Sequence, residues 1–357
     1  MKVVIITGAG ATLSEAIDKS LLLRPPVDNG FFEIANKSDK DLCQPILKYF
    51  SKHYNTNIIG SSYDSLEGIM TKLFVDSYHS KLSSEATIAY KAFISILNRR
   101  IANTTNQIPI KSNGNLYRII LGHLEHGIRP QDITIITFNQ DLYIEKTLHF
   151  LNKNINKYGN LFNFPFLYKI SELNNPTKPN GWKDDHYMLF QVGHKSEQSI
   201  DVLKLHGSLN WYSRHISKNI NPDSLFKIDR KINATRRKKL TLDMTIKTKR
   251  KTMYSFPLIV PPINHKSGVI HHAIQPIWNI AEERLRESTE IMIFGYSCPT
   301  TDIESQNLLQ RAMSNNVTLA NVLVINPDKN VLLKYAKLIN PKKLTFYPTA
   351  EDYFKYS

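Results

Sequence analysis

Apolar residues gather in short uninterrupted runs along the chain, without regular alternation of apolar and polar positions. The first run occupies residues 3–6 and consists of valine and isoleucine. Such runs are typical of strands that are covered on both faces in a parallel sheet. We predict six strands of this kind, at residues 3–6, 133–137, 202–205, 258–260, 291–294 and 322–325.

Segments with a helical spacing of apolar residues lie between these runs. Over residues 274–285, apolar side chains recur every three or four positions, which indicates an amphipathic helix. Three more helices are predicted: over 143–151, over 302–313, and from about Glu15 after a cap at Thr12 or Ser14. Strands that alternate with such helices indicate βαβ units, so we predict an α/β fold with a parallel sheet and helices on both faces.

Residues 40–130 break this alternation because their pattern is mostly helical. Two apolar faces recur at helical spacing, one formed by Leu66, Ile69, Met70, Leu73 and Phe74, the other by Leu116, Ile119, Ile120 and Leu124. We interpret residues 40–130 as a smaller helical module, inserted into a sheet domain formed by residues 1–39 and 131–357. Between residues 151 and 202 the chain has no clear period and is predicted to be irregular.

Composition narrows the class of protein. The chain has 357 residues, enough for about two domains. Its two cysteines, Cys43 and Cys298, exclude a disulfide framework and a zinc site built from four cysteines, so a cytoplasmic location fits best. No apolar run approaches the roughly 20 residues of a membrane-spanning helix. The apolar stretch at residues 3–6 is too short for a signal peptide. We therefore expect no association with a membrane.

The first predicted strand leads into a loop of small residues, Gly8, Ala9, Gly10 and Ala11. A strand that passes through such a loop into a helix brings backbone N–H groups and the positive end of the helix to one point, which suits a pyrophosphate. The fingerprint of dinucleotide dehydrogenases is broken, because its third glycine falls at Leu13. This loop therefore has two interpretations, a phosphate-binding loop and a tight structural turn.

Polar residues follow four further predicted strands. They are Thr137 with Asn139 and Asp141, His206 with Gly207 and Ser208, Gly295 with Tyr296 and Ser297, and Asn326 with Asp328. In open α/β sheets, ligands bind just beyond the carboxyl ends of the strands. Each segment alone has a plainer interpretation, since Asn and Asp are common turn residues and a single histidine is more often structural. Together they predict one shared polar pocket.

In order and spacing, these segments resemble the sirtuin family. The resemblance is carried by Gly8-Ala9-Gly10-Ala11, Thr137-x-Asn139-x-Asp141, Leu205-His206-Gly207-Ser208, and Gly295-Tyr296-Ser297 with Thr301-Asp302 downstream. The chain looks most similar to the sirtuin-like domains of bacterial anti-phage defence proteins, which share the proline pairs found here at Pro25-Pro26 and Pro261-Pro262. The resemblance extends over residues 1–329 and is least anchored in the helical module.

The resemblance implies a Rossmann-like domain that binds NAD, with a smaller module that clasps the dinucleotide. It places Gly8, Ala9 and Gly10 at the phosphates, Asn139 and Asp141 at the nicotinamide ribose, and Gly295, Ser297 and Asn326 at the adenosine side. Ala11, Thr137, Tyr296 and Asp328 complete the predicted NAD contacts. It identifies His206 as the catalytic histidine, with Asn139 and Asp141 beside it. Asp141 has an alternative role as the cap of the next helix.

Sirtuin deacylases usually carry four zinc-binding cysteines, whereas this chain has two cysteines in all. We therefore expect no zinc or other metal site, and an NAD+ hydrolase that takes NAD as substrate and releases nicotinamide and ADP-ribose. The resemblance further implies anti-phage defence by NAD depletion, gated by a homo-oligomer, a partner ATPase or a phage-sensing protein. A protein deacylase, a nucleic-acid-binding regulator and an ADP-ribose sensor are the alternatives.

The net charge of the chain is +15, and most of it comes from one segment. Residues 227–251 hold eleven basic and two acidic residues, a net charge of +9. A cluster of this density can neutralise phosphates, so contact with nucleic acid is one interpretation. Docking of an acidic partner and a solvated loop are the other two.

Overall fold

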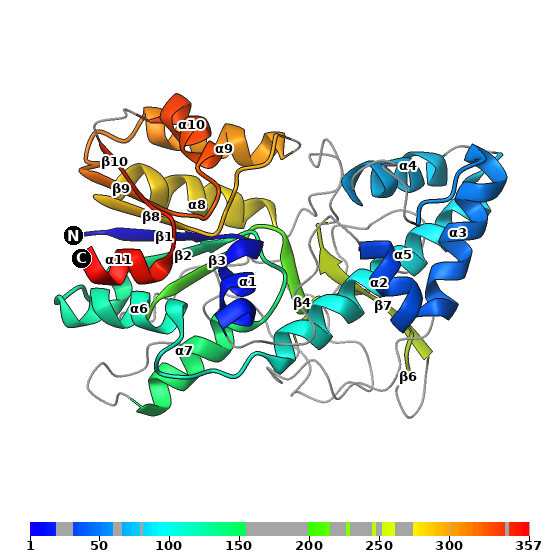
Figure 1. Ribbon diagram of the computed structural model, residues 1–357, viewed down its shortest axis with the longest axis horizontal. Helices are drawn as coiled ribbons and strands as arrows, with labels where there is room; N and C mark the ends of the chain where they lie inside the picture. Colours follow the sequence, from blue (N-terminus) through cyan, green and yellow to red (C-terminus); the bar gives the residue numbers. More distant parts are fainter. Residues whose placement is uncertain are drawn as a thin grey trace.

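The structure is a computed structural model that describes residues 1–18, 31–59, 66–78, 81–154, 199–214, 226–228, 245–247, 252–260, 274–300, 302–339 and 343–356. At its centre lies a six-stranded parallel sheet in the order β10-β9-β8-β1-β2-β3 (Figure 1). Its strands are β1 (Val3–Thr7), β2 (Ile133–Thr137), β3 (Asp201–Lys204), β8 (Glu290–Phe294), β9 (Asn321–Ile325) and β10 (Leu344–Tyr347).

The strand order reverses next to β1. Counted along the chain within this sheet, the strands lie in the order 3-2-1-4-5-6, which is that of doubly wound α/β folds. The reversal falls between β1 and β8, which pair in parallel from Val3 with Glu290 to Thr7 with Phe294. Folds of this kind bind ligands beyond the carboxyl ends of the strands at the reversal. The predicted α/β, Rossmann-like architecture is confirmed.

Helices cover both faces of the sheet, as Figure 1 shows. On one face lie α1 (Ala9–Asp18), α6 (Asn115–Glu125) and α7 (Tyr143–Asn154); on the other lie α8 (Gln275–Glu287), α9 (Ile303–Ser314) and α10 (Asn330–Leu338). The short helix η1 (Pro130–Asp132) precedes β2, and α11 (Ala350–Tyr356) follows β10. Every residue of β1 and β2 is buried, which explains why these strands consist of β-branched residues without alternation.

A second, antiparallel sheet has the order β5-β4-β7-β6. It consists of β4 (Gly207–Arg214), β5 (Phe226–Ile228), β6 (Thr245–Lys247) and β7 (Thr252–Ile259). The strand predicted at residues 258–260 therefore belongs to β7 in this sheet and not to the parallel one. The prediction of its place was wrong because an apolar run of three residues has no period that separates the two kinds of sheet.

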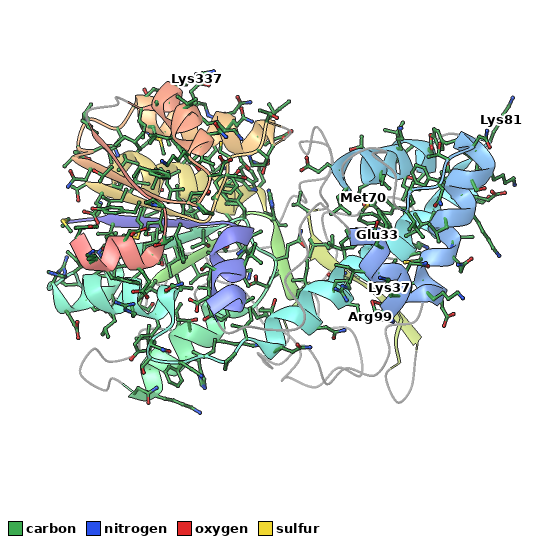
Figure 2. The ribbon with its side chains drawn as sticks, in the orientation of Figure 1. Glu33, Lys37, Met70, Lys81, Arg99 and Lys337 are labelled. Carbon is green, nitrogen blue, oxygen red and sulfur yellow. The ribbon has the colours of Figure 1, made fainter. Side chains whose placement is uncertain are left out.

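The helical module forms its own apolar core. It contains α2 (Phe31–Ser38), α3 (Lys40–Tyr54), α4 (Leu66–Tyr78) and α5 (Ser83–Gln107). Met70 and Phe93 are fully buried in this apolar core. Met70 is labelled in Figure 2. Residues of α6 belong instead to the core of the parallel sheet. The predicted helical content is confirmed, and the boundaries at residues 40 and 130 stay a prediction.

Two further details differ from the predictions. The helix after β1 begins at Ala9 rather than near Glu15, because the glycine loop enters the helix directly. Thr12 and Ser14 consequently lie inside α1 instead of capping it. The elements α10, β10 and α11 were not predicted, since the exposed and half-buried residues of β10 lack the apolar run of a central strand.

Several predicted segments lie outside the described residues. They include Pro25-Pro26, most of the irregular region 151–202, and the basic segment 227–251 apart from the backbone of short pieces of β5 and β6. Among the described helices, none has both the length and the apolar character needed to cross a membrane.

Candidate functional site

Three glycines bring two loops into direct contact where the strand order reverses. Gly8 and Gly10 follow β1, and Gly295 follows β8 with a φ of 63°. A Cβ on Gly10 would lie 2.7 Å from the Gly295 carbonyl oxygen, and a Cβ on Gly295 would lie 2.1 Å from the Ala11 nitrogen. We call this contact the glycine crossing. Only glycine fits at these positions, because the two backbones touch.

Backbone N–H groups at the glycine crossing donate hydrogen bonds to carbonyl oxygens of the two loops. Gly8 N donates to the Phe294 carbonyl at 3.3 Å, Gly10 N to the Gly295 carbonyl at 2.9 Å, and Ala11 N to the Gly8 carbonyl at 2.9 Å. Gly8 and Ala11 are buried, whereas Ala9 is exposed and Gly10 half-buried. Ala9 is the first residue of α1, so the positive end of that helix is accessible at the crossing. Of the predicted phosphate contacts, Ala9 and Gly10 are the accessible ones.

Asn139 connects the loop after β2 to the glycine crossing. Its Nδ2 donates to the Gly8 carbonyl oxygen at 2.8 Å and to Thr12 Oγ1 at 3.1 Å. Its backbone N–H donates to Thr137 Oγ1 at 3.0 Å. Because the Gly8 carbonyl can only accept, the orientation of the side-chain amide is fixed. Both hydrogens of Nδ2 are used within the protein, so Oδ1 is the atom that Asn139 offers to a hydroxyl or a water.

Asp141 is held at the start of α7. Its Oδ1 accepts from Tyr143 N at 2.9 Å, and its Oδ2 accepts from Thr12 Oγ1 at 2.8 Å. Burial raises the pKa of this carboxyl, and the nearby Lys204 ammonium opposes the rise. Lys204 Nζ donates to the Asp141 carbonyl oxygen and to Glu145 Oε1, the latter at 2.8 Å. Both carboxylate oxygens of Asp141 are thus engaged by the protein, and the bond from Tyr143 N fits its predicted alternative role as the cap of α7.

His206 lies at the carboxyl end of β3, where the chain turns into β4. Its ring packs edge-on against Phe138, with 5.3 Å between the centroids, and lies 6.3 Å from the ring of Trp278. Trp278 Nε1 donates to the Leu205 carbonyl at 3.0 Å. Phe138 in turn stacks on Tyr296 at 4.0 Å. Aromatic side chains from the ends of β2 and β8 and from α8 therefore hold the imidazole in place.

A carboxylate faces this imidazole. Asp302 Oδ2 lies 3.5 Å from His206 Nε2 and 3.4 Å from the Tyr296 hydroxyl oxygen, which donates to it. Asp302 is 1% exposed. Sequence reasoning placed Asp302 in a motif and gave it no role, because an aspartate before a helix is typical of a cap.

The sequence analysis assigned no role in the site to Thr12 and Lys204. Thr12 was predicted as a helix cap, and its hydroxyl instead links Asn139 to Asp141. Lys204 is fully buried and pairs with Glu145 beneath the loop that carries Asp141. The available signal for Lys204 was a lysine inside the apolar run at residues 202–205.

The residues predicted at the adenosine side differ in their exposure and in their hydrogen-bond partners. Ser297 is exposed, and its carbonyl accepts from Lys334 Nζ at 3.2 Å. Asn326 is buried after β9, where its Oδ1 accepts from Asp328 N at 3.0 Å. Asp328 is exposed, and its Oδ1 accepts from Asn330 N at the start of α10. The structure thus joins Gly8, Gly10, Gly295, Asn139 and Asp141 by direct contacts, while Asp328 serves α10.

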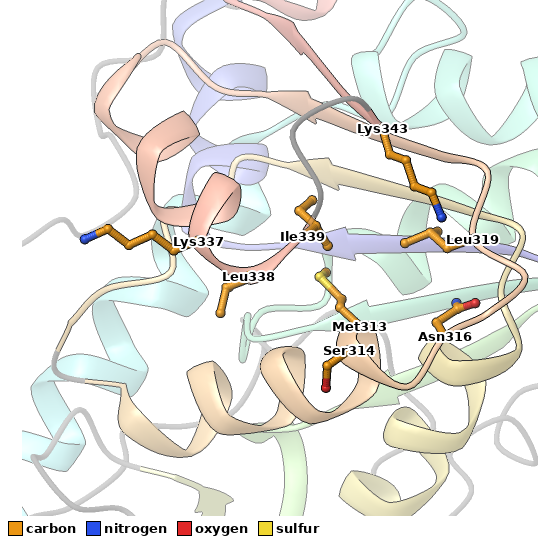
Figure 3. Close-up of a pocket in the computed structure, with 8 residues that line it drawn as sticks. All are labelled: Met313, Ser314, Asn316, Leu319, Lys337, Leu338, Ile339 and Lys343. Carbon is orange, nitrogen blue, oxygen red and sulfur yellow. The ribbon is translucent and has the colours of Figure 1, made fainter.

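Metal ligands do not cluster among the residues that the structure describes. In that part of the chain, no group of three or more His, Cys, Asp or Glu side chains is arranged to hold a metal ion. Three histidines close together in the sequence, His265, His271 and His272, lie outside the described residues. A cavity of about 220 Å³ between the ends of α9 and α10 is lined by Met313, Ser314, Asn316, Leu319, Lys337, Leu338, Ile339 and Lys343 (Figure 3). Its residues precede β9 and β10, so it lies at the opposite edge of the sheet from His206.

The fold is similar to solved structures at low sequence identity. No protein-family model and no curated protein matches the chain. A structure described as the basis of sirtuin substrate affinity shares 12% identity at a TM-score of 0.45, covering 99% of this chain and 91% of that chain. A Sir2 complex with an inhibitor, 2′-O-acetyl-ADP-ribose and a deacetylated peptide shares 12% identity at a TM-score of 0.41, covering 99% of this chain and 90% of that one. Such values transfer no residue roles, so any role rests on the geometry of this chain.

Proposed function

We propose that this chain is an NAD+ hydrolase that breaks the bond between nicotinamide and ribose. One observation carries the proposal: Asn139 bonds to the glycine crossing at the reversal of a doubly wound parallel sheet, and the ring of His206 is linked to the same region through Phe138 and Tyr296. That edge is where such sheets bind dinucleotides. The motifs that resemble sirtuins follow β1, β2, β3 and β8, so each lies at the carboxyl end of a strand of this sheet.

The reaction does not require the protein to protonate the leaving group. The bond between C1′ of the ribose and the pyridinium nitrogen breaks, and its electron pair leaves with nicotinamide, which needs no proton. Positive charge develops on the ribose as in glycoside hydrolysis. A water oxygen bonds to C1′ and loses one proton, which gives ADP-ribose, nicotinamide and a proton.

The described side chains suit these steps. Asn139 Oδ1 can accept a hydrogen bond from a ribose hydroxyl or from the attacking water, because its Nδ2 is committed to Gly8 and Thr12. His206 can accept the proton that the water or a ribose hydroxyl releases. The accessible start of α1 provides the positive dipole end that a pyrophosphate requires.

Turnover of NAD by the purified chain tests the proposal. We expect His206→Ala and Asn139→Ala each to reduce turnover at least ~10²-fold, which is the low end for the loss of a general base. His149→Ala removes an exposed histidine of α7 and serves as the matched control. Nicotinamide release is followed by chromatography, with folding checked by circular dichroism. Turnover within tenfold of wild type in either site variant would remove that residue from the mechanism.

The same assay separates the alternative activities. Addition of an acetylated peptide reveals a deacylase if nicotinamide release depends on the peptide and the acetyl group moves to ADP-ribose. An ADP-ribose sensor binds the nucleotide without NAD loss. A nucleic-acid-binding regulator retains DNA with a steep dependence on salt and consumes no NAD.

The resemblance extends the proposal to bacterial anti-phage defence through NAD depletion. An enzyme of this kind harms its host when it is always active, so we propose gating by a homo-oligomer or by a partner ATPase or phage-sensing protein. Light scattering of the purified chain and NAD measurements in infected cells test these two points.

A further inference from the structure

His206 lies in a segment whose main chain is hydrogen-bonded on both sides of the histidine to the loop after β2. Before the histidine, Leu205 N donates to the Thr137 carbonyl oxygen at 3.0 Å. After it, Leu209 N donates to the Gln140 carbonyl oxygen at 2.9 Å. The loop after β2 therefore fixes the place of the main chain that carries the histidine.

The side chain of Gln140 adds a further bond toward the same segment. Its Nε2 donates to the Val260 carbonyl oxygen at 2.7 Å, and Val260 N donates to the His206 carbonyl oxygen at 2.9 Å. Because a carbonyl oxygen can only accept, the contact fixes which end of the Gln140 amide faces Val260. Val260 is buried, so water has little access to compete for the bond. The residue that follows β7 thus joins Gln140 to His206.

The neighbour of Gln140 in the chain is held by a different part of the molecule. Asn139 Nδ2 donates to the Gly8 carbonyl oxygen and to Thr12 Oγ1, both at the glycine crossing or in α1. Two adjacent residues of one loop therefore contact two different parts of the site. Asn139 is bonded to the glycine crossing, and Gln140 is bonded to the segment that carries His206.

We propose that Gln140 is a positioning residue that sets the place of His206 relative to Asn139. Its importance for the reaction rests on the proposed function. The aromatic contacts of His206 orient the imidazole ring, whereas the bonds of Gln140 place the main chain behind that ring. Gln140 touches no reacting atom in this scheme and acts through Val260 and Leu209. A displacement of about 1 Å between reacting groups can reduce a rate about 10²-fold.

Two substitutions remove the side-chain bond of Gln140. Gln140→Met has a side chain of similar size that cannot donate to Val260. Gln140→Asn keeps the amide on a side chain one methylene shorter, which does not reach the Val260 carbonyl. We expect each variant to lower the kcat for NAD by roughly 10-fold or more with KM within about threefold, because the glycine crossing is unchanged. A kcat equal to that of the wild type in both variants overturns the proposal.

Two controls separate positioning from a loss of stability. Asn316 Nδ2 donates to the Leu285 and Ser288 carbonyl oxygens at 2.7 and 2.8 Å, at the edge of the sheet opposite to His206. Asn316→Leu should lower the free energy of unfolding and leave kcat unchanged. In the His206→Ala background, Gln140→Met is expected to have no further effect, since residues that act as a unit are not additive. Equal loss of kcat from Gln140→Met with and without His206 would overturn the proposal.

Hydrogen exchange measures the link between the two loops without NAD. In Gln140→Met, we expect the amides of Leu209 and Val260 to exchange at least about 10-fold faster than in the wild type, because local opening becomes easier. Mass spectrometry of peptides that contain these amides measures the rates, and Asn316→Leu should leave them unchanged. Unchanged exchange in Gln140→Met refutes the link, and faster exchange with an unaltered kcat refutes the positioning role. Absence of NAD turnover in a wild type, with exchange as expected, refutes the proposed hydrolase and leaves the link in place.

Discussion

Gly295 shows at the scale of one residue how closely the two loops approach. Its φ of 63° is unfavourable for any side chain, and a Cβ would lie 2.4 Å from the Gly10 carbonyl carbon. We expect Gly295→Ala to lower the free energy of unfolding by at least about 2 kcal/mol, because an L-residue in this region alone costs roughly 1–2 kcal/mol. Urea unfolding followed by circular dichroism measures the change.

Gly122 is the matched control for this substitution. It lies within α6, and a Cβ there would have no neighbour within 4 Å. Gly122→Ala is expected to raise the free energy of unfolding by about 0.5–1 kcal/mol, the usual gain in a helix. An alanine tolerated equally well at both positions would contradict the tight approach of the two loops.

For single residues, the sequence predicts which strand end they follow but not which other residues they contact. The pattern places Asn139 and His206 at strand ends, and the structure joins Asn139 to the glycine crossing. Gly8 and Gly10 were predicted to admit a phosphate, whereas their missing side chains admit the backbone of Gly295. That contact is a tertiary one, so no local pattern contains it.

A buried ion pair links β3 to α7. Lys204 and Glu145 are both fully buried, with 2.8 Å between Nζ and Oε1. We expect Lys204→Met to cost about 3–5 kcal/mol of stability, because it leaves a buried carboxylate without its ammonium partner. The double variant Lys204→Met/Glu145→Leu should recover most of that loss in urea unfolding. A single variant as stable as the wild type would show that the pair contributes nothing.

Among the elements, strong patterns were predicted and weak ones were not. Central strands such as β1 and β2 are buried on both faces and therefore consist of uninterrupted apolar runs. The edge strand β10 has exposed and half-buried residues, and the antiparallel sheet pairs strands separated by long stretches of chain. Neither leaves a local period in the sequence, which is why both were missed.

The stability of the whole molecule should depend on pH through a buried histidine. Burial lowers the pKa of His123 to about 4, and its Nδ1 lies 3.9 Å from Glu290 Oε1. An unfolded chain binds a proton at this histidine near its ordinary pKa of about 6.5. The stability that neutral His123 contributes is therefore present above about pH 6.5 and is lost as the pH falls toward 4.

The loss should reach about 3 kcal/mol between about pH 7 and about pH 4. Burial raises the pKa of Glu290, which acts in the opposite direction as the pH falls. Comparison with His123→Gln isolates the histidine, since Glu290 is present in both proteins. Urea unfolding at several pH values should show a smaller loss for the variant. Parallel pH curves would exclude His123 as the cause.

The site described above draws its groups from Gly8 at one end to Asp302 at the other, with Asn139 and His206 between them. During synthesis, a nascent chain cannot complete this arrangement until β8 and the residue before α9 have left the ribosome. If the chain destroys NAD as proposed, an unfinished polypeptide is harmless to the cell that makes it. Premature termination before Gly295 then yields a fragment without the glycine crossing, which lacks part of the site that the proposed hydrolase requires.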